Sequence, residues 1–359
     1  LDDSGHAYTP QMALRFAGWM NRWLLDAPDR LIPTIDESSL ELLDAALLAC
    51  VPRQERNIFS ENRDVALRLR ETRPVPDLQG IRRVIELGEA DPVPEADMGE
   101  PIRSWQHWVR EVVLKPVPGI VLPATWLYPV DEEHRTGAVL YFDDRGRWTD
   151  LKKQGRAAGW AGFLGEHTET RQLLSVDLRG WGDTAPAELP YDLAGWGGRD
   201  RWIAYVSAAL GDSIMAMRIR DGLAAYSWLR KSPGVVKIVV GGHGLGAVVA
   251  LHVAVMAGDA AGVFCDEMPA DIEMLVSQSV CAWPPDTFLP QVLRHYDLPE
   301  LAGMAAAPVL INNSLNAQRQ EIDRETARKV YAKACEHNPR CRIAFGDNIA
   351  AFVTEALRE

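Results

Sequence analysis

The segment Gly242-His243-Gly244-Leu245-Gly246 has the spacing of a nucleophile elbow, a sharp turn that joins a strand to a helix. An apolar run at 236–240 precedes it, and a helical pattern follows it. In G-x-S-x-G elbows the central residue carries the attacking oxygen, and the flanking glycines avoid collisions with neighbouring backbone. The central residue here is Gly244, which has no side chain. The pattern therefore predicts the backbone of an elbow without the atom that attacks a carbonyl.

Strands and helices must alternate around this elbow to hold it in place. A long helix is expected over 200–230, and a closing helix over 348–357. A hairpin is expected over 109–129 around the turn Pro118-Gly119. Further short apolar strands are expected at 138–142, 173–183, 236–240, 262–268, 307–313 and 341–345. Alternation at this spacing predicts an α/β fold with a mostly parallel sheet covered by helices on both faces.

These features together resemble the α/β-hydrolase superfamily, and within it the bacterial acetyl-xylan-esterase-like hydrolases. The resemblance covers residues 109–359 and also rests on SVDLRGWGDT at 175–184 and on LPQVLRHYDLPELAGMAAAPVLINN at 289–313. It implies an α/β-hydrolase fold and a carboxylic-ester hydrolase chemistry. In such enzymes a serine, an acid and a histidine follow one another along the chain.

The resemblance also places the acid and the histidine, and neither is present at its position. The acid should follow the strand at 308–312, where the loop offers amides, and Asn316 is taken as the vacated acid position. The histidine should follow the strand at 341–345, but no histidine occurs after His337. Since all three positions are altered, we expect a natural non-catalytic domain. An active or artificially inactivated carboxylic-ester hydrolase is the alternative.

Several residues around the elbow are expected to line a pocket. His243 and Leu245 flank Gly244, and His243 is interpreted as packing rather than as a catalytic base. Asp143, Asp144 and Arg145 follow the strand at 138–142, where the resemblance places an oxyanion loop; a solvated turn is the other interpretation. A retained pocket leaves open a third function, a module that binds a carbohydrate or an acyl ligand, with an acylated carbohydrate as the candidate partner. On the following helix, His252 is expected to be a satisfied core histidine.

The first residues resemble the last stretch of another α/β-hydrolase. In GHAYTPQMALRFAGWMNRWL, His6 precedes a helix that Thr9-Pro10 starts and that carries an apolar stripe. His6 is thus a candidate catalytic histidine of an upstream hydrolase domain, the expected partner; an ordinary loop residue is the alternative. The predicted organisation is a tail of that domain at 1–26, a helical and extended connecting region at 27–108, and the α/β-hydrolase domain at 109–359.

Composition excludes several other classes of function. The net charge of −12 argues against nucleic-acid binding. No apolar run approaches the roughly 18 residues that a membrane span needs. The five cysteines show no spacing typical of a zinc site, and no cofactor or metal is expected. A soluble protein of bacterial type is expected, either cytoplasmic or exported, and any signal segment would precede Leu1.

Overall fold

The computed structural model describes residues 4–33, 43–48, 56–88, 93–104, 107–131, 136–149, 171–187, 198–346 and 348–358. The chain divides into two compact units, Leu1–Glu55 and Arg56–Glu359, which are described separately. The first unit contains α1 (Pro10–Leu24). Its start is the predicted one, because the Thr9 hydroxyl accepts a hydrogen bond from the Met12 amide at 3.2 Å. No residue of α1 is buried.

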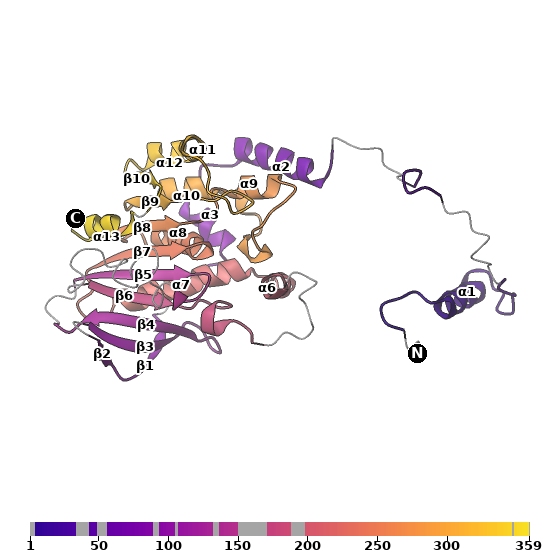
Figure 1. The fold of residues 1–359 in the computed structure, drawn as a ribbon, viewed down its shortest axis with the longest axis horizontal. Helices are drawn as coiled ribbons and strands as arrows, with labels where there is room; N and C mark the ends of the chain where they lie inside the picture. Colours follow the sequence, from indigo (N-terminus) through magenta and orange to yellow (C-terminus); the bar gives the residue numbers. More distant parts are fainter. Residues whose placement is uncertain are drawn as a thin grey trace. The chain divides into compact units, whose positions relative to one another are not determined.

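The second unit is built on a ten-stranded mixed sheet in the described part of the chain (Figure 1). The strand order is β1-β3-β4-β6-β5-β7-β8-β9-β10, and β2 pairs with β3. Neighbouring strands from β6 across to β10 pair in parallel, while β1 to β4 pair antiparallel, as does β4 with β6. Their bounds are β1 (Glu95–Met98), β2 (Ile102–Ser104), β3 (His107–Lys115), β4 (Leu122–Pro129), β5 (Gly137–Asp143), β6 (Arg171–Val176), β7 (Lys237–His243), β8 (Gly262–Asp266), β9 (Val309–Asn312) and β10 (Cys341–Ala344).

Helices cover both faces of this sheet, as the sequence predicts. Alternate residues of β5 separate the two faces: Leu140 and Phe142 join the core under α7 and α8, while Val139 and Tyr141 join the core under α13. The helices of the second unit are α2 (Ile58–Thr72), α3 (Leu78–Val84), α6 (Gly198–Ala209), α7 (Ile214–Arg230), α8 (Leu245–Ala257), α9 (Ile272–Ser277), α10 (Leu298–Met304), α11 (Arg324–Val330), α12 (Ala332–His337) and α13 (Ile349–Arg358), with 3-10 turns η4 (Gly182–Thr184), η6 (Pro285–Thr287) and η7 (Val292–Arg294).

The single long helix predicted over 200–230 is wrong, since the structure has α6 and α7 there. The chain leaves α6 through Gly211, whose φ of +83° is a left-handed conformation that helices do not contain. Ser213 then caps α7, its hydroxyl accepting the Ala216 amide at 3.1 Å. The apolar periodicity continues across the break, and this continuity hid the turn from the sequence pattern.

Two buried polar residues fix the helices that lie under the elbow. On α7, Arg218 is fully buried and donates to the Asp286 carboxylate in η6 at 2.7 Å. On α8, His252 is fully buried; its Nδ1 lies 2.8 Å from the Val248 carbonyl and its Nε2 lies 2.9 Å from the Tyr296 hydroxyl. The predicted role of His252 as a satisfied core histidine is confirmed.

The register of the parallel strands aligns their last residues in one row. Asp143 of β5 pairs with His243 of β7, His243 with Asp266 of β8, and Asp266 with Asn312 of β9. Ala344 of β10 completes the row beside Asn312. Because ligands of open α/β sheets bind at the carboxyl ends of parallel strands, this row is where a functional site is expected.

Candidate functional site

The elbow at the end of β7 has the backbone that the sequence predicts. Gly244 has φ +58° and ψ −124°, a conformation that L side chains adopt rarely, and α8 starts directly after it. A Cβ on Gly242 would lie 2.2 Å from the Gly246 carbonyl oxygen, and a Cβ on Gly246 would lie 2.3 Å from the Phe142 carbonyl oxygen. The predicted steric role of the two flanking glycines is therefore confirmed.

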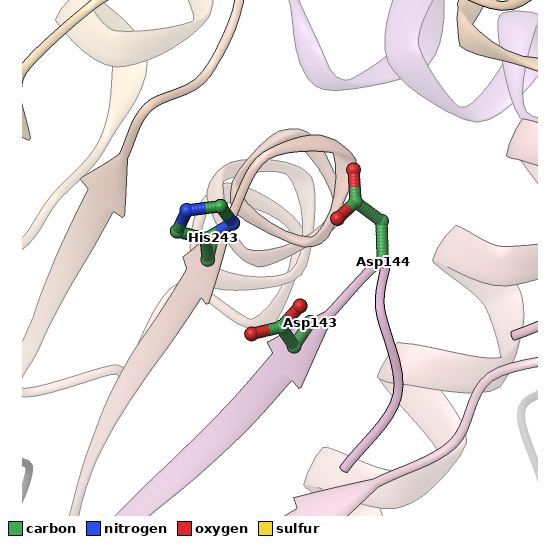
Figure 2. A group of neighbouring side chains, drawn as sticks. All are labelled: Asp143, Asp144 and His243. Carbon is green, nitrogen blue, oxygen red and sulfur yellow. The ribbon is translucent and has the colours of Figure 1, made fainter. Parts of the chain in front are cut away.

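The side chain of Asp144 occupies the space at the apex of this elbow. A Cβ built on Gly244 would lie 2.5 Å from Asp144 Oδ2, so the carboxylate stands where the first atom of a nucleophilic side chain would be. The same oxygen accepts the backbone N–H of Leu245 at 3.0 Å. Burial raises the pKa of Asp144, and the hydrogen bond from Leu245 opposes that rise. The apex is thus filled by Asp144, which directly follows β5, and Figure 2 shows its carboxylate beside the helix that follows the elbow.

The neighbouring Asp143 is bound tightly to Arg145. Its carboxylate accepts the Arg145 amide at 2.9 Å, the guanidinium at 2.8 and 2.6 Å, and the Tyr141 hydroxyl at 3.1 Å. Burial would raise the pKa of Asp143, but the hydrogen bonds and charge of Arg145 and the charge of His243 outweigh it and lower the pKa. Asp143 is 1% exposed, so the alternative of a solvated turn is wrong for this residue.

His243 lies at the end of β7 and pairs with an acid from the neighbouring strand. Its Nε2 is 3.1 Å from Glu267 Oε2, directly after β8. Burial would lower the pKa of His243, but the Glu267 hydrogen bond and the charge of Asp143 raise it above the ordinary value. The other ring nitrogen, Nδ1, is buried and has no hydrogen-bond partner among the residues that the structure describes.

The loop after β9 is closed by amides. Asn316, the predicted acid position, turns its side-chain oxygen onto the amides of Gln318 and Gln320 at 2.9 and 3.0 Å. Its assignment as the vacated acid position stays a prediction. Asn312 and Asn313 were not singled out from the sequence, although both come directly at the end of a predicted strand.

These two asparagines join three strand ends. The Asn312 amide donates to Asp266 at 2.8 Å and to the Gly346 carbonyl at 2.9 Å, and the Asn313 amide donates to Asp266 at 3.2 Å. Gly346 N–H returns a bond of 2.8 Å to the Asn313 side chain. The two amides therefore join the Asp266 carboxylate at the end of β8 to the Gly346 backbone after β10.

His6, the remaining candidate, lies in the first unit. It is exposed in the loop before α1. Its proposed role concerns a different hydrolase domain and nothing in the second unit.

The arrangement of side chains at the strand ends also suits a cation. The ligand atoms of Asp143, Asp144 and His243 lie within 4.8 Å of one another, as do those of His243, Asp266 and Glu267. His243 belongs to both groups.

None of the described helices is long and apolar enough to cross a bilayer.

Comparison with known proteins supports the fold. No family model and no curated protein matches the chain. Among solved structures it is similar to a Bacteroides fragilis protein assigned to the acetyl xylan esterases, with a TM-score of 0.57 and 15% identity over 88% of this chain and 86% of that one. Acetyl Xylan Esterase 1 from a Thermoanaerobacterium species matches with a TM-score of 0.53 and 14% identity over 81% and 97%. A glucuronoyl esterase from Solibacter usitatus matches with a TM-score of 0.55 and 11% identity over 90% and 96%.

The second unit therefore has the α/β-hydrolase fold found in these esterases. Identities of 11–15% extend no further than the fold. What the domain does must be argued from its own residues.

Proposed function

We propose that this domain is a non-catalytic member of the α/β-hydrolase fold that supports a separate, active carboxylic-ester hydrolase domain. The observation that carries the proposal is the position of Asp144. Its carboxylate takes up the space at Gly244 and accepts the Leu245 amide at 3.0 Å.

Asp144 affects two parts of the chemistry at once. Acyl transfer needs a nucleophilic atom at the apex, and none projects from Gly244. It also needs backbone donors aimed at the oxyanion of the tetrahedral intermediate, one of which is the N–H after the nucleophile. In this chain that N–H belongs to Leu245, and it already donates to the Asp144 side chain. A substrate oxyanion at this position would meet a carboxylate in place of an open donor.

The surrounding loops support the same conclusion. The strand ends where an acid and a histidine are expected are joined by Asn312 and Asn313. An amide cannot stabilise an imidazolium as a carboxylate does. The imidazole of His243 is already hydrogen-bonded to Glu267 through its Nε2 atom.

The proposed partner is an upstream hydrolase domain that uses His6 as its catalytic base. The support is the position of His6 just before α1, a helix with no buried residue and with Leu14, Trp19 and Trp23 each more than 45% exposed. An apolar helix face of this size is typical of a surface that another element covers. The proposal predicts a G-x-S-x-G segment and an aspartate in the reading frame before Leu1, and a frame without them contradicts it.

Hydrolysis of an aryl acetate tests the non-catalytic role. In buffer with EDTA, we expect the native chain, Gly244→Ser and Gly244→Ser/Asp144→Ala to release product at the rate of buffer alone. The double variant matters because removing the Asp144 carboxylate makes room for a serine. Far-UV circular dichroism must show that each protein is folded.

Turnover by the native chain that disappears in Asp144→Ala would overturn the proposal. Turnover by the double variant would instead favour the alternative, an inactivated carboxylic-ester hydrolase. In that case the chain contains a catalytic acid and a catalytic base that lie outside the row of paired strand ends.

A second candidate function, carbohydrate binding, is favoured by an aromatic pocket of about 650 Å³. Trp126 contacts Tyr128 and Trp228, with ring centroids 4.4 and 5.3 Å apart. Arg110 and Lys231 also line the pocket. Aromatic walls with a few polar groups are typical of small-molecule sites. None of the residues that line this pocket belongs to the elbow at 242–246 or to the row of paired strand ends.

Intrinsic fluorescence during a titration with xylo-oligosaccharides tests this candidate. Saturable quenching that Trp228→Ala removes, and that Trp23→Ala on α1 preserves, would support carbohydrate binding. Quenching that is linear in ligand, or the same in both variants, would exclude it.

A further inference from the structure

Four acidic side chains lie near His243 at the ends of β5 and β8: Asp143, Asp144, Asp266 and Glu267. Asp143, Asp144 and His243 place one ligand atom each within 4.8 Å of one another, and all three are largely buried. Asp143 is the last residue of β5, Asp144 directly follows it, and His243 is the last residue of β7. Figure 2 shows the imidazole ring and both carboxylates around the start of α8.

The imidazole is oriented in the way that metal-binding histidines are. A metal-bound histidine commonly donates its other ring N–H to a carboxylate, which fixes the tautomer. His243 has this partner, since its Nε2 is 3.1 Å from Glu267. With the proton on Nε2, the lone pair on Nδ1 faces the side of the two aspartates (Figure 2).

The Nδ1 atom is the independent observation that points to a ligand. It is buried without a hydrogen-bond partner among the described residues, in a residue that is 8% exposed. A buried polar atom without a hydrogen-bond partner destabilises the folded state. Carboxylate oxygens of Asp143 and Asp144 lie within 4.8 Å of a ring nitrogen of His243, and a carboxylate accepts hydrogen bonds and does not donate them. A cation between these three acceptors satisfies all of them.

We infer that a divalent transition-metal cation binds at the apex of the elbow, with Nδ1 of His243 and the carboxylates of Asp143 and Asp144 as ligands. One imidazole and two carboxylates suit Zn²⁺ or Mn²⁺, whereas Mg²⁺ prefers oxygen ligands alone. Glu267 is the residue that orients the imidazole. The site does not depend on whether the domain is catalytic.

Two arginines balance the carboxylates in the metal-free protein. Arg145 binds Asp143 at 2.6 Å with a side chain that is 42% exposed, so it can move into solvent when a cation arrives. Arg319 lies 4.0 Å from Asp144. Arg145 is therefore a competitor of the metal for Asp143.

The spacing of the sequence predicts no metal, because His243 lies far along the chain from the two aspartates. Only the pairing of Asp143 with His243 across β5 and β7 brings the ligands together. The metal site therefore departs from the sequence-based expectation.

Isothermal titration of the chelator-treated chain with Zn²⁺, Mn²⁺ and Mg²⁺ tests the inference. We expect Zn²⁺ or Mn²⁺ to bind at a single site, and Mg²⁺ to bind at least about 10-fold more weakly. Asp144→Asn and His243→Gln should each weaken binding by at least about 10-fold, and Glu267→Gln by about 10-fold. Arg145→Gln should tighten binding, because Asp143 loses its competitor.

Two exposed residues give matched controls. Asp97→Asn and His337→Gln remove the same kinds of group from the surface and should leave the affinity unchanged. Circular dichroism must show that each variant is folded. The Asp144 and His243 variants remove different ligands, so each tests the site separately.

Absence of binding at about 1 mM metal would overturn the inference, since so weak a site has a binding free energy below about 4 kcal/mol. Binding that survives both Asp144→Asn and His243→Gln would overturn it as well. An unchanged affinity in Arg145→Gln would contradict the three-ligand arrangement.

Discussion

We expect Gly244→Ala to lower the free energy of unfolding by about 4 kcal/mol. The backbone of Gly244, with φ +58° and ψ −124°, costs an L residue about 1–3 kcal/mol. The new Cβ would lie 2.5 Å from Asp144 Oδ2, so the carboxylate must move and leave the Leu245 amide. Loss of that buried hydrogen bond costs about 1–3 kcal/mol more.

A double-mutant cycle separates these two contributions. In an Asp144→Ala background the carboxylate is gone, so Gly244→Ala should cost only the backbone part. The coupling energy between the two positions is then expected at about 1–3 kcal/mol. Gly258→Ala is the matched control, because Gly258 has φ +73° and a Cβ there would meet no neighbouring atom within 4 Å. It should cost about 1–2 kcal/mol.

Urea unfolding followed by far-UV circular dichroism measures all four differences. The reasoning is refuted if Gly244→Ala costs no more than Gly258→Ala. It is also refuted if the cost of Gly244→Ala is the same with and without Asp144, because the carboxylate then does not occupy the apex.

Two further predictions concern buried groups under the elbow. Burial lowers the pKa of His252 to about 4, and an unfolded histidine has a pKa near 6.5, so the unfolded state takes up a proton first as pH falls. The contribution of neutral His252 to the free energy of unfolding is complete above about pH 6.5 and should fall by about 3 kcal/mol as the pH drops through 4. Urea unfolding across this range should show the loss in the native chain. A His252→Gln variant that shows the same loss would contradict the prediction. Arg218→Met leaves the Asp286 carboxylate buried without its partner and should lower the free energy of unfolding in urea by about 3–5 kcal/mol. Arg218→Met/Asp286→Leu should lower it by less, because no buried charge remains without a partner. Equal losses in the two variants would contradict this account.

Local sequence carries enough information to predict the elbow. The bend at Gly244 and the close approach of Gly242 and Gly246 to neighbouring backbone depend on residues within one strand, turn and helix. The strands from β5 to β10 were predictable for a similar reason, since each is a short apolar run with clear boundaries.

The contacts of the site depend on register and could not be predicted. That Asp143 lies beside His243, and His243 beside Asp266, follows from how three strands align, and no local pattern encodes that alignment. The position of Asp144 over Gly244 depends further on the path of the chain after β5. The pocket residues were therefore predicted as neighbours of the elbow, while the filling of its apex was not.

The asparagine bonds between the end of β9 and the loop after β10 have a consequence for pH. Carboxamides neither gain nor lose protons in the range where proteins are folded. The bonds of Asn312 and Asn313 to the Gly346 backbone therefore hold the loop after β10 in the same way in acid and in alkali. A proton relay needs side chains that can take up and release a proton, and these carboxamides serve only to hold the two loops together.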